Sequence, residues 1–174
     1  MMHKRGETEN NICVNCKKNK VEKSSHILLC TNEKATEFYH KKVKEELKKE
    51  LEKRHTSSIL RDTIIDILTK WRQKQAIDYT DYSQQYKIRD AVLEQKKIGW
   101  TNFVLGRFSP KWQISQDIYY TEPNKQQSSQ RWLTAIVKKF LLICWDVWDF
   151  QNNLIHRKVG RIDRVRNKEL CFQI

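Results

Sequence analysis

The segment from residue 128 to residue 157 restricts the possible folds of this chain more than any other. Apolar residues recur in it at steps of three and four, the spacing of one helix face. The repeat consists of Trp132, Ile136, Phe140, Ile143 and Val147, and neighbouring positions hold Leu141, Leu142, Trp145, Trp148 and Leu154. A helix that is apolar around most of its circumference is buried on most sides. We therefore expect the central helix of a bundle.

The rest of the chain also favours helices. Only four glycines and two prolines occur in 174 residues, and folds built from many short strands need both at their turns. The fold class is therefore predicted to be all-α, a helical bundle with a small metal-binding module in front of it. Helices at 58–75, 83–107 and 128–157 should form the core, and the lysine-rich helix 33–55 should project or lie on the surface.

Individual side chains are assigned to this core from their spacing. In 58–75 the inward residues are predicted to be Ile59, Leu60, Ile64, Ile65, Ile67, Leu68 and Trp71. In 33–55 a narrow buried stripe is predicted from Phe38, Tyr39, Val43, Leu47 and Leu51. The tryptophans could instead offer stacking platforms for single strands. Core packing is the preferred interpretation for Trp100, Trp112, Trp132, Trp145 and Trp148.

Four potential metal ligands lie close together near the start of the chain, in the order Cys13-x2-Cys16-x9-His26-x3-Cys30. The short gap lets the first two reach one ion from a tight turn, and the last two stand one helical turn apart. Zinc binds tetrahedrally through such ligands, and a site closed by four of them is structural rather than catalytic. We predict a Zn²⁺ site here; a chance grouping of thiols with one histidine is the alternative.

The charge balance indicates a polyanionic partner. The chain has 34 lysines and arginines against 21 acidic residues, a formal net charge of +13, which favours RNA or DNA. Candidate phosphate contacts are the lysines between the ligand pairs and two arginines beside aromatic helices: Lys17, Lys18, Lys20, Lys23, Arg107 and Arg131. The alternatives are plain solubility for the lysines and surface ion pairs for the arginines.

The cysteines and the apolar runs indicate in which cellular compartment the protein is expected. Five cysteines are an odd number, the first residues are polar, and no apolar run approaches the ~20 residues of a membrane span. We expect an intracellular protein, nuclear or cytoplasmic, with reduced cysteines and no membrane partner. Cys144 and Cys171 are predicted to be small buried hydrophobes.

No enzyme constellation is recognisable. The four glycines are scattered, so no loop is built to hold phosphates. Cys144 and His156 are twelve residues apart on one predicted helix, about 18 Å along its axis, too far for a nucleophile and its base. The chain is predicted not to be an enzyme and to have no small-molecule substrate.

Several stretches together resemble a known family. The cysteine–histidine cluster, the order Ile98-Gly99-Trp100 with Gly106-Arg107 and Trp112, and the run from Trp145 to His156 are similar to the zinc-knuckle and downstream helical C-terminal region of LINE-like (non-LTR) retroelement reverse transcriptase polyproteins. The similarity spans about residues 11–157. One departure is Gln151, which stands where the family pattern often has an arginine.

The resemblance implies a retrotransposon-derived fragment without the polymerase and RNase H regions. Such polymerases carry a Tyr-x-Asp-Asp loop, whereas Tyr79-Thr80-Asp81-Tyr82 lacks the second carboxylate that two-metal chemistry needs; we expect a surface turn there. The segments are a disordered lead-in at 1–10, the zinc knuckle at 11–32, the helical domain at 33–157 and a basic tail at 158–174.

The predicted function is a non-catalytic zinc-binding fragment that contacts nucleic acid. Two alternatives stay open. The helical part could be a protein-interaction or structural module, docking on the rest of a polyprotein or on itself. The chain could also be a degenerate open reading frame without a selected function.

Overall fold

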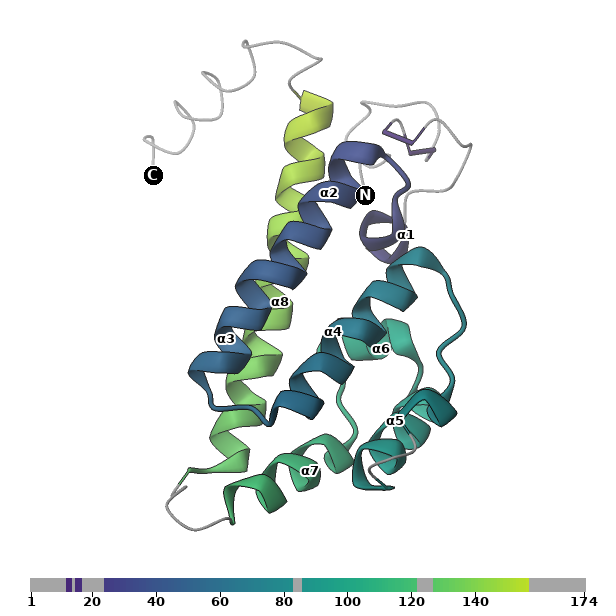
Figure 1. Cartoon of the computed structure of the whole chain (residues 1–174). Coiled ribbons are helices and arrows are strands. Elements are labelled where there is room, and N and C mark those ends of the chain that lie inside the picture. The colour runs from purple at the N-terminus through teal and green to yellow at the C-terminus, as the bar shows by residue number, and fades with distance from the viewer. Residues whose placement is uncertain (1–11, 14, 17–23, 83–85, 122–126, 157–174) are drawn as a thin grey trace. The chain divides into compact units, whose positions relative to one another are not determined.

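The fold class is all-α, as predicted (Figure 1). The structure, a computed structural model, describes residues 12–13, 15–16, 24–82, 86–121 and 127–156, and this part of the chain contains helices and turns but no strand. The elements are α1 (Ser24–Leu29), α2 (Glu33–Lys41), the π-helix η2 (Lys42–Leu47), α3 (Lys48–Lys53), α4 (Ser58–Gln73), the 3₁₀-helix η3 (Tyr79–Tyr82), α5 (Tyr86–Ile98), α6 (Trp100–Val104), α7 (Pro110–Tyr120) and α8 (Ser129–His156). Of the described helices, none is long and apolar enough to cross a membrane.

The chain divides into two compact units. The central unit runs from Glu37 to Trp145, and the terminal unit combines Met1–Thr36 with Asp146–Ile174. The predicted lead-in at 1–10 and basic tail at 158–174 lie outside the described residues.

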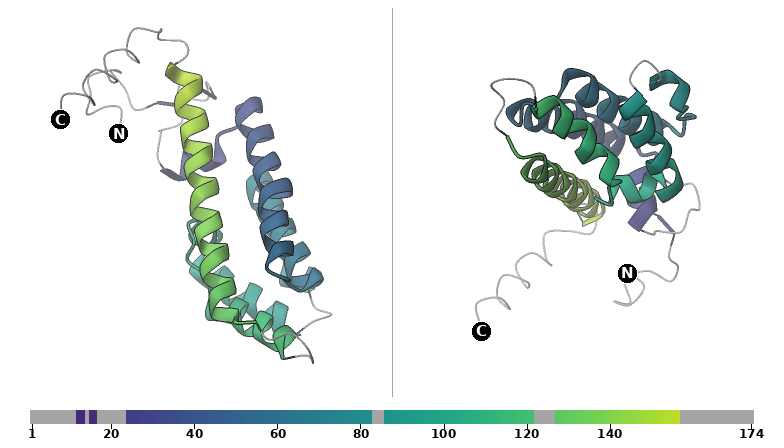
Figure 2. Two further views of the ribbon diagram at one scale, coloured as in Figure 1. Left: turned by 90° about the vertical axis from the view of Figure 1, so that its left-hand side faces the viewer. Right: turned by 90° about the horizontal axis from the view of Figure 1, so that it is seen from below.

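In the central unit, α2, η2 and α3 follow one another without a break (Figure 2). Together they bury one stripe of side chains. The stripe steps by four residues through Tyr39, Val43, Leu47 and Leu51, each at most 2% exposed. A step of four overshoots the 3.6-residue turn of an α-helix by about 40°. The wider π turns of η2, with their i→i+5 bonds, take up part of this drift and keep the stripe on one face. The predicted stripe is confirmed, although Phe38 is only half-buried.

Helix α4 packs against this stripe and contributes much of the core. Most of its predicted inward residues are buried, namely Leu60, Ile64, Ile67, Leu68 and Trp71. Two were wrong: Ile59 is 46% exposed and Ile65 is half-buried. Ile59 stands in the first turn, where the helix begins at the molecular surface.

On the neighbouring η2, Glu46 accepts from Lys139 of α8 (2.7 Å) and from Lys42, and these partners lower the pKa of its carboxyl.

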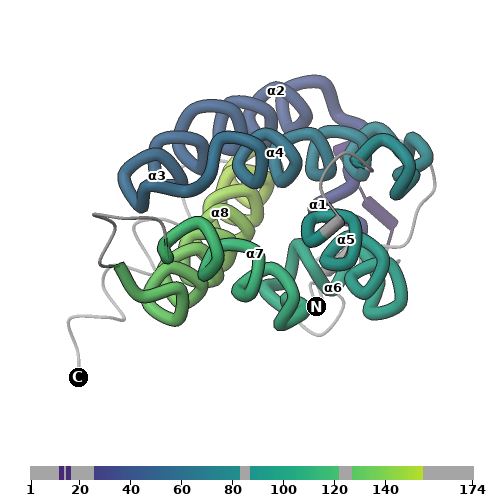
Figure 3. The backbone as a smooth tube through the Cα atoms, turned by 60° about the horizontal axis from the view of Figure 1, so that its bottom comes forward, coloured from purple at the N-terminus to yellow at the C-terminus, as the bar shows by residue number. Residues whose placement is uncertain are grey.

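A buried glutamine holds the turn between α6 and α7. Gln95 of α5 is fully buried. Its Oε1 accepts two hydrogen bonds, from the backbone N–H of Ser109 (2.8 Å) and from Nε1 of Trp112 (3.1 Å). Its Nε2 donates to the backbone carbonyl of Arg107 (3.1 Å). Ser109 then caps α7, accepting from the N–H of Lys111, with proline at the first helical position. Gln95 therefore joins α5 to α7, which lie side by side (Figure 3).

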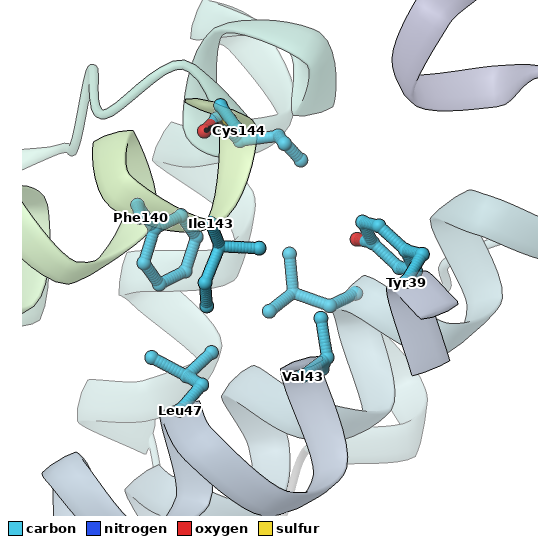
Figure 4. A pocket seen from close by; sticks show the side chains of 8 residues that line it. Tyr39, Val43, Leu47, Phe140, Ile143 and Cys144 are labelled. Carbon is cyan, nitrogen blue, oxygen red and sulfur yellow. Dashed lines mark hydrogen bonds between the residues drawn. The ribbon is translucent and has the colours of Figure 1, made fainter. Parts of the chain in front are cut away.

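Aromatic rings fill the middle of the central unit. Phe103 lies 5.3 Å from both Trp112 and Phe140, and 4.5 Å from Phe108, measured between ring centroids. A cavity of about 10 Å³ remains nearby, lined by Tyr39, Val43, Leu47, Leu68, Val104, Phe140, Ile143 and Cys144. The hydroxyl of Tyr39 is buried and turned into it (Figure 4). This space is of the order of one water molecule, too small for an organic ligand.

Helix α8 has its predicted length but not its predicted burial. Its repeat is buried at Trp132, Ile136, Phe140, Ile143 and Val147. The neighbouring apolar residues were expected inside and are not, because Leu141, Leu142, Trp145 and Trp148 are 50%, 48%, 63% and 41% exposed. The description of α8 as a helix enclosed on most sides was therefore wrong. Trp112, Trp132 and Trp71 are buried as predicted, and Trp100 is half-buried.

Candidate metal centre

The four predicted ligands converge in the terminal unit. Cys13 and Cys30 are buried, with 1% and 0% exposure, and Cys16 and His26 are half-buried. The sulfurs of Cys13 and Cys30 are 3.9 Å apart, and Cys16 Sγ is 3.5 Å from Nε2 of His26. All four ligand atoms lie within 4.8 Å of one another, close enough to hold one metal ion.

Local structure explains how the ligands reach one point. Cys16 lies in a turn, and α1 carries His26. Cys30 was predicted on the same helix but is the first residue after its end at Leu29. The chain then turns into α2, where Asn32 accepts from the N–H of Ala35 at 3.2 Å and caps the helix.

The separation of the two buried sulfurs matches that of two ligands on one tetrahedral ion. Bonds of about 2.3 Å from a metal to sulfur at tetrahedral angles place two sulfurs about 3.8 Å apart, close to the observed 3.9 Å. Four protein ligands leave no position open for a substrate or a reactive water. An ion bound by all four residues would therefore be fully coordinated by the protein.

Burial affects the acidity of the two inner thiols. Desolvation raises the pKa of Cys13, and the neighbouring Cys16 thiol adds to this rise. Desolvation also raises the pKa of Cys30 to about 12, with Cys13 as a further cause. Both thiols are therefore neutral near pH 7 when no cation is present, and a bound cation must displace their protons.

Three side chains around the ligands were not foreseen as part of the site. Asn32 Nδ2 donates to the carbonyl of Asn15 at 3.2 Å, and Asn15 Nδ2 donates to the carbonyl of Gln151 at 3.4 Å. The amide of Gln151 in turn donates to the carbonyl of Ile27. The position of Asn32 before a helix was a visible signal. The contacts of Asn15 and Gln151 join parts of the chain 136 residues apart, and no local pattern predicts them.

The predicted nucleic-acid contacts are described only in part. Lys17, Lys18, Lys20 and Lys23 lie outside the described residues. Arg107 is exposed after α6 and donates from Nη1 to Asn102 at 3.2 Å, and Arg131 is exposed in the first turn of α8. The Tyr79–Tyr82 run forms the surface turn η3, where Asp81 pairs with Lys70 at 2.8 Å. No second cluster of metal-ligand side chains occurs in the part of the chain that the structure describes.

No protein-family model, curated protein or solved structure matches this chain.

Proposed function

We propose that this chain is a non-catalytic zinc-binding protein that contacts nucleic acid, with Zn²⁺ bound by Cys13, Cys16, His26 and Cys30. The observation that carries the proposal is the grouping of these four ligand atoms within 4.8 Å. A donor set of three sulfurs and one imidazole nitrogen suits zinc, whereas magnesium and calcium prefer oxygen. The metal would order the segment from Cys13 to Cys30.

The nucleic-acid part of the proposal is supported by charge. Besides the net charge of +13, the 22 residues from Gln95 to Gln116 contain four basic residues and no acidic one: Lys96, Lys97, Arg107 and Lys111. All four are exposed. The side chain of Gln95 is hydrogen-bonded to the backbone of Arg107 and Ser109. These bonds fix the backbone that carries the basic side chains. The resemblance to retroelement polyproteins is consistent with such a partner.

Binding to RNA or DNA is expected to weaken steeply with salt. Each phosphate contact contributes about 0.7 to the slope of log K against log salt for single strands and about 0.9 for duplex DNA. Arg107→Gln and Arg131→Gln should each lower that slope by about one, measured by fluorescence anisotropy. Arg54→Gln is the matched control, since this arginine is paired with Glu50 at 2.8 Å. A wild type without binding at low salt would remove the nucleic-acid function.

The alternative of a protein-interaction module has its own observation. Leu141, Leu142 and Trp145 are 48–63% exposed on one helix, and such apolar surface is often used for contacts with another protein. Sedimentation of the purified chain over a range of concentrations distinguishes self-association from a monomer. Absence of nucleic-acid binding together with a concentration-dependent dimer would favour this alternative.

Metal uptake is expected to release protons. Cys13 and Cys30 hold raised thiol pKa values without metal, and both must bind as thiolates. Each of these two thiols releases about one proton per ion near neutral pH, and Cys16 must also bind as a thiolate, so the apparent zinc affinity should rise by at least about a hundredfold per pH unit. Calorimetric titration with zinc in buffers of different ionisation enthalpy measures this number. Uptake without proton release would show that the buried thiols are not the ligands.

A further inference from the structure

The side chain of Gln151 is a buried polar group among the described residues of the terminal unit. It lies on α8 and is 2% exposed, although an amide in such a position must give up its hydrogen bonds to water. Its amide nitrogen and its backbone carbonyl contact the two halves of the candidate metal centre, whereas its buried amide oxygen has no hydrogen-bond partner among the described residues.

The first contact reaches the half that contains His26 and Cys30. Gln151 Nε2 donates to the carbonyl of Ile27, the residue directly after His26. A carbonyl can only accept a hydrogen bond, so the amide nitrogen and not the amide oxygen must face it. The direction of this hydrogen bond is thereby fixed.

The second contact reaches the half that contains Cys13 and Cys16. Asn15 lies between these two cysteines, and its Nδ2 donates to the backbone carbonyl of Gln151 at 3.4 Å. Asn32 adds a third link, since its Nδ2 donates to the carbonyl of Asn15 at 3.2 Å while its Oδ1 caps α2. One residue of α8 thus holds two segments whose ligands must meet at one ion.

We propose that Gln151 is a positioning residue for the metal site: it sets the distance between the Cys13–Cys16 pair and the His26–Cys30 pair, so that zinc binding and the packing of α8 residues 146–154 reinforce each other. This inference depends on the proposed zinc function. Removal of a residue that supports the direct metal ligands through hydrogen bonds commonly lowers metal affinity by about 10–100-fold. The coupling is reciprocal, since whatever α8 adds to zinc affinity, zinc must add to the stability of α8 packing.

Zinc affinity of the full chain, measured by competition with a chromophoric chelator, tests the proposal. Gln151→Ala should weaken zinc binding by about 10–100-fold. Gln151→Glu keeps the size but places a carboxylate against the Ile27 carbonyl, and it should weaken zinc binding at least as much. Asn15→Ala removes the other link and should give a loss in the same range. Asn153→Ala is the matched control on α8, since this amide donates to Asp149 within its own helix.

A second readout separates positioning from a general structural role. Amide hydrogen exchange at residues 146–154 should slow when zinc is added to the wild type and slow much less in Gln151→Glu, while the central unit at 37–145 keeps its protection in both. Unchanged zinc affinity in Gln151→Glu and Asn15→Ala would overturn the inference while leaving the zinc site itself intact. A wild type that binds no zinc would instead remove the proposed function and this inference with it.

Discussion

Replacing Cys30 with serine is expected to lower zinc affinity by more than about a hundredfold. This loss is larger than that expected for removal of a residue that only supports the direct ligands. Cys30 is fully buried and its sulfur stands 3.9 Å from that of Cys13. A serine hydroxyl is a poor zinc ligand, because it does not become an anion near neutral pH as a thiol does on a metal. The metal should then be held by three ligands at most, and the segment from Cys13 to Cys30 should lose its order.

The same variant tests whether loss of the metal affects only the terminal unit. The central unit consists of residues 37–145 and contains none of the four ligands, so the helical circular-dichroism signal of Cys30→Ser should stay close to that of the wild type. Limited proteolysis should cut near residues 13–30 much faster. Cys144→Ala is the matched control, a thiol in the central unit that donates to the Val104 carbonyl. Equal zinc affinity in Cys30→Ser and Cys144→Ala would contradict the assigned ligand set.

Replacing Trp112 with alanine is expected to destabilise the central unit by about 3–5 kcal/mol. Trp112 is fully buried, packs 5.3 Å from Phe103 and donates from its indole nitrogen to Gln95. The substitution leaves a large cavity and removes one of the two donors to the Gln95 oxygen. In a chain of this size the midpoint of thermal unfolding should fall by roughly 10 °C.

Ile114→Ala provides the comparison for Trp112→Ala on the same helix. Ile114 is 46% exposed, so its truncation should lower stability by less than about 1 kcal/mol. Urea unfolding followed by circular dichroism measures both. Similar losses in the two variants would mean that α7 does not pack against the core through Trp112.

Helix positions were largely predictable because their signals are local. The scarcity of glycine and proline, the Ser109–Pro110 cap and the periodic apolar residues determine where α4, α7 and α8 begin and end. The π-helix η2 was not predictable in this way. It follows from the need to keep Val43 and Leu47 on the face that meets the core, which depends on the partner helices.

The burial of α8 was mispredicted for a physical reason. A sequence shows which faces of a helix are apolar but not how many of them meet a neighbour. Folded proteins keep much apolar surface exposed, and Trp145 at 63% exposure is such a case. Counting apolar residues around the helix therefore overestimated the number of packing partners.

The grouping of the four candidate ligands was predictable, whereas the hydrogen bonds around them were not. Spacing alone brings Cys13 beside Cys16 and His26 near Cys30, because each pair is held by one turn of backbone. Beside the two pairs lie Asn15, Asn32 and Gln151, whose hydrogen bonds span up to 136 residues. In the sequence, Gln151 was notable only because the retroelement family often has an arginine at this position, and that difference did not indicate its role.

X-ray absorption at the zinc edge, on protein purified under reducing conditions and loaded with one equivalent of Zn²⁺, tests the central claim most directly. Coordination by Cys13, Cys16, His26 and Cys30 predicts three sulfur neighbours at about 2.3 Å and one nitrogen at about 2.0–2.1 Å. The Cys13→Ser variant should show fewer sulfur neighbours. A wild-type spectrum with only oxygen and nitrogen neighbours, or protein that retains no zinc, would contradict the proposed site.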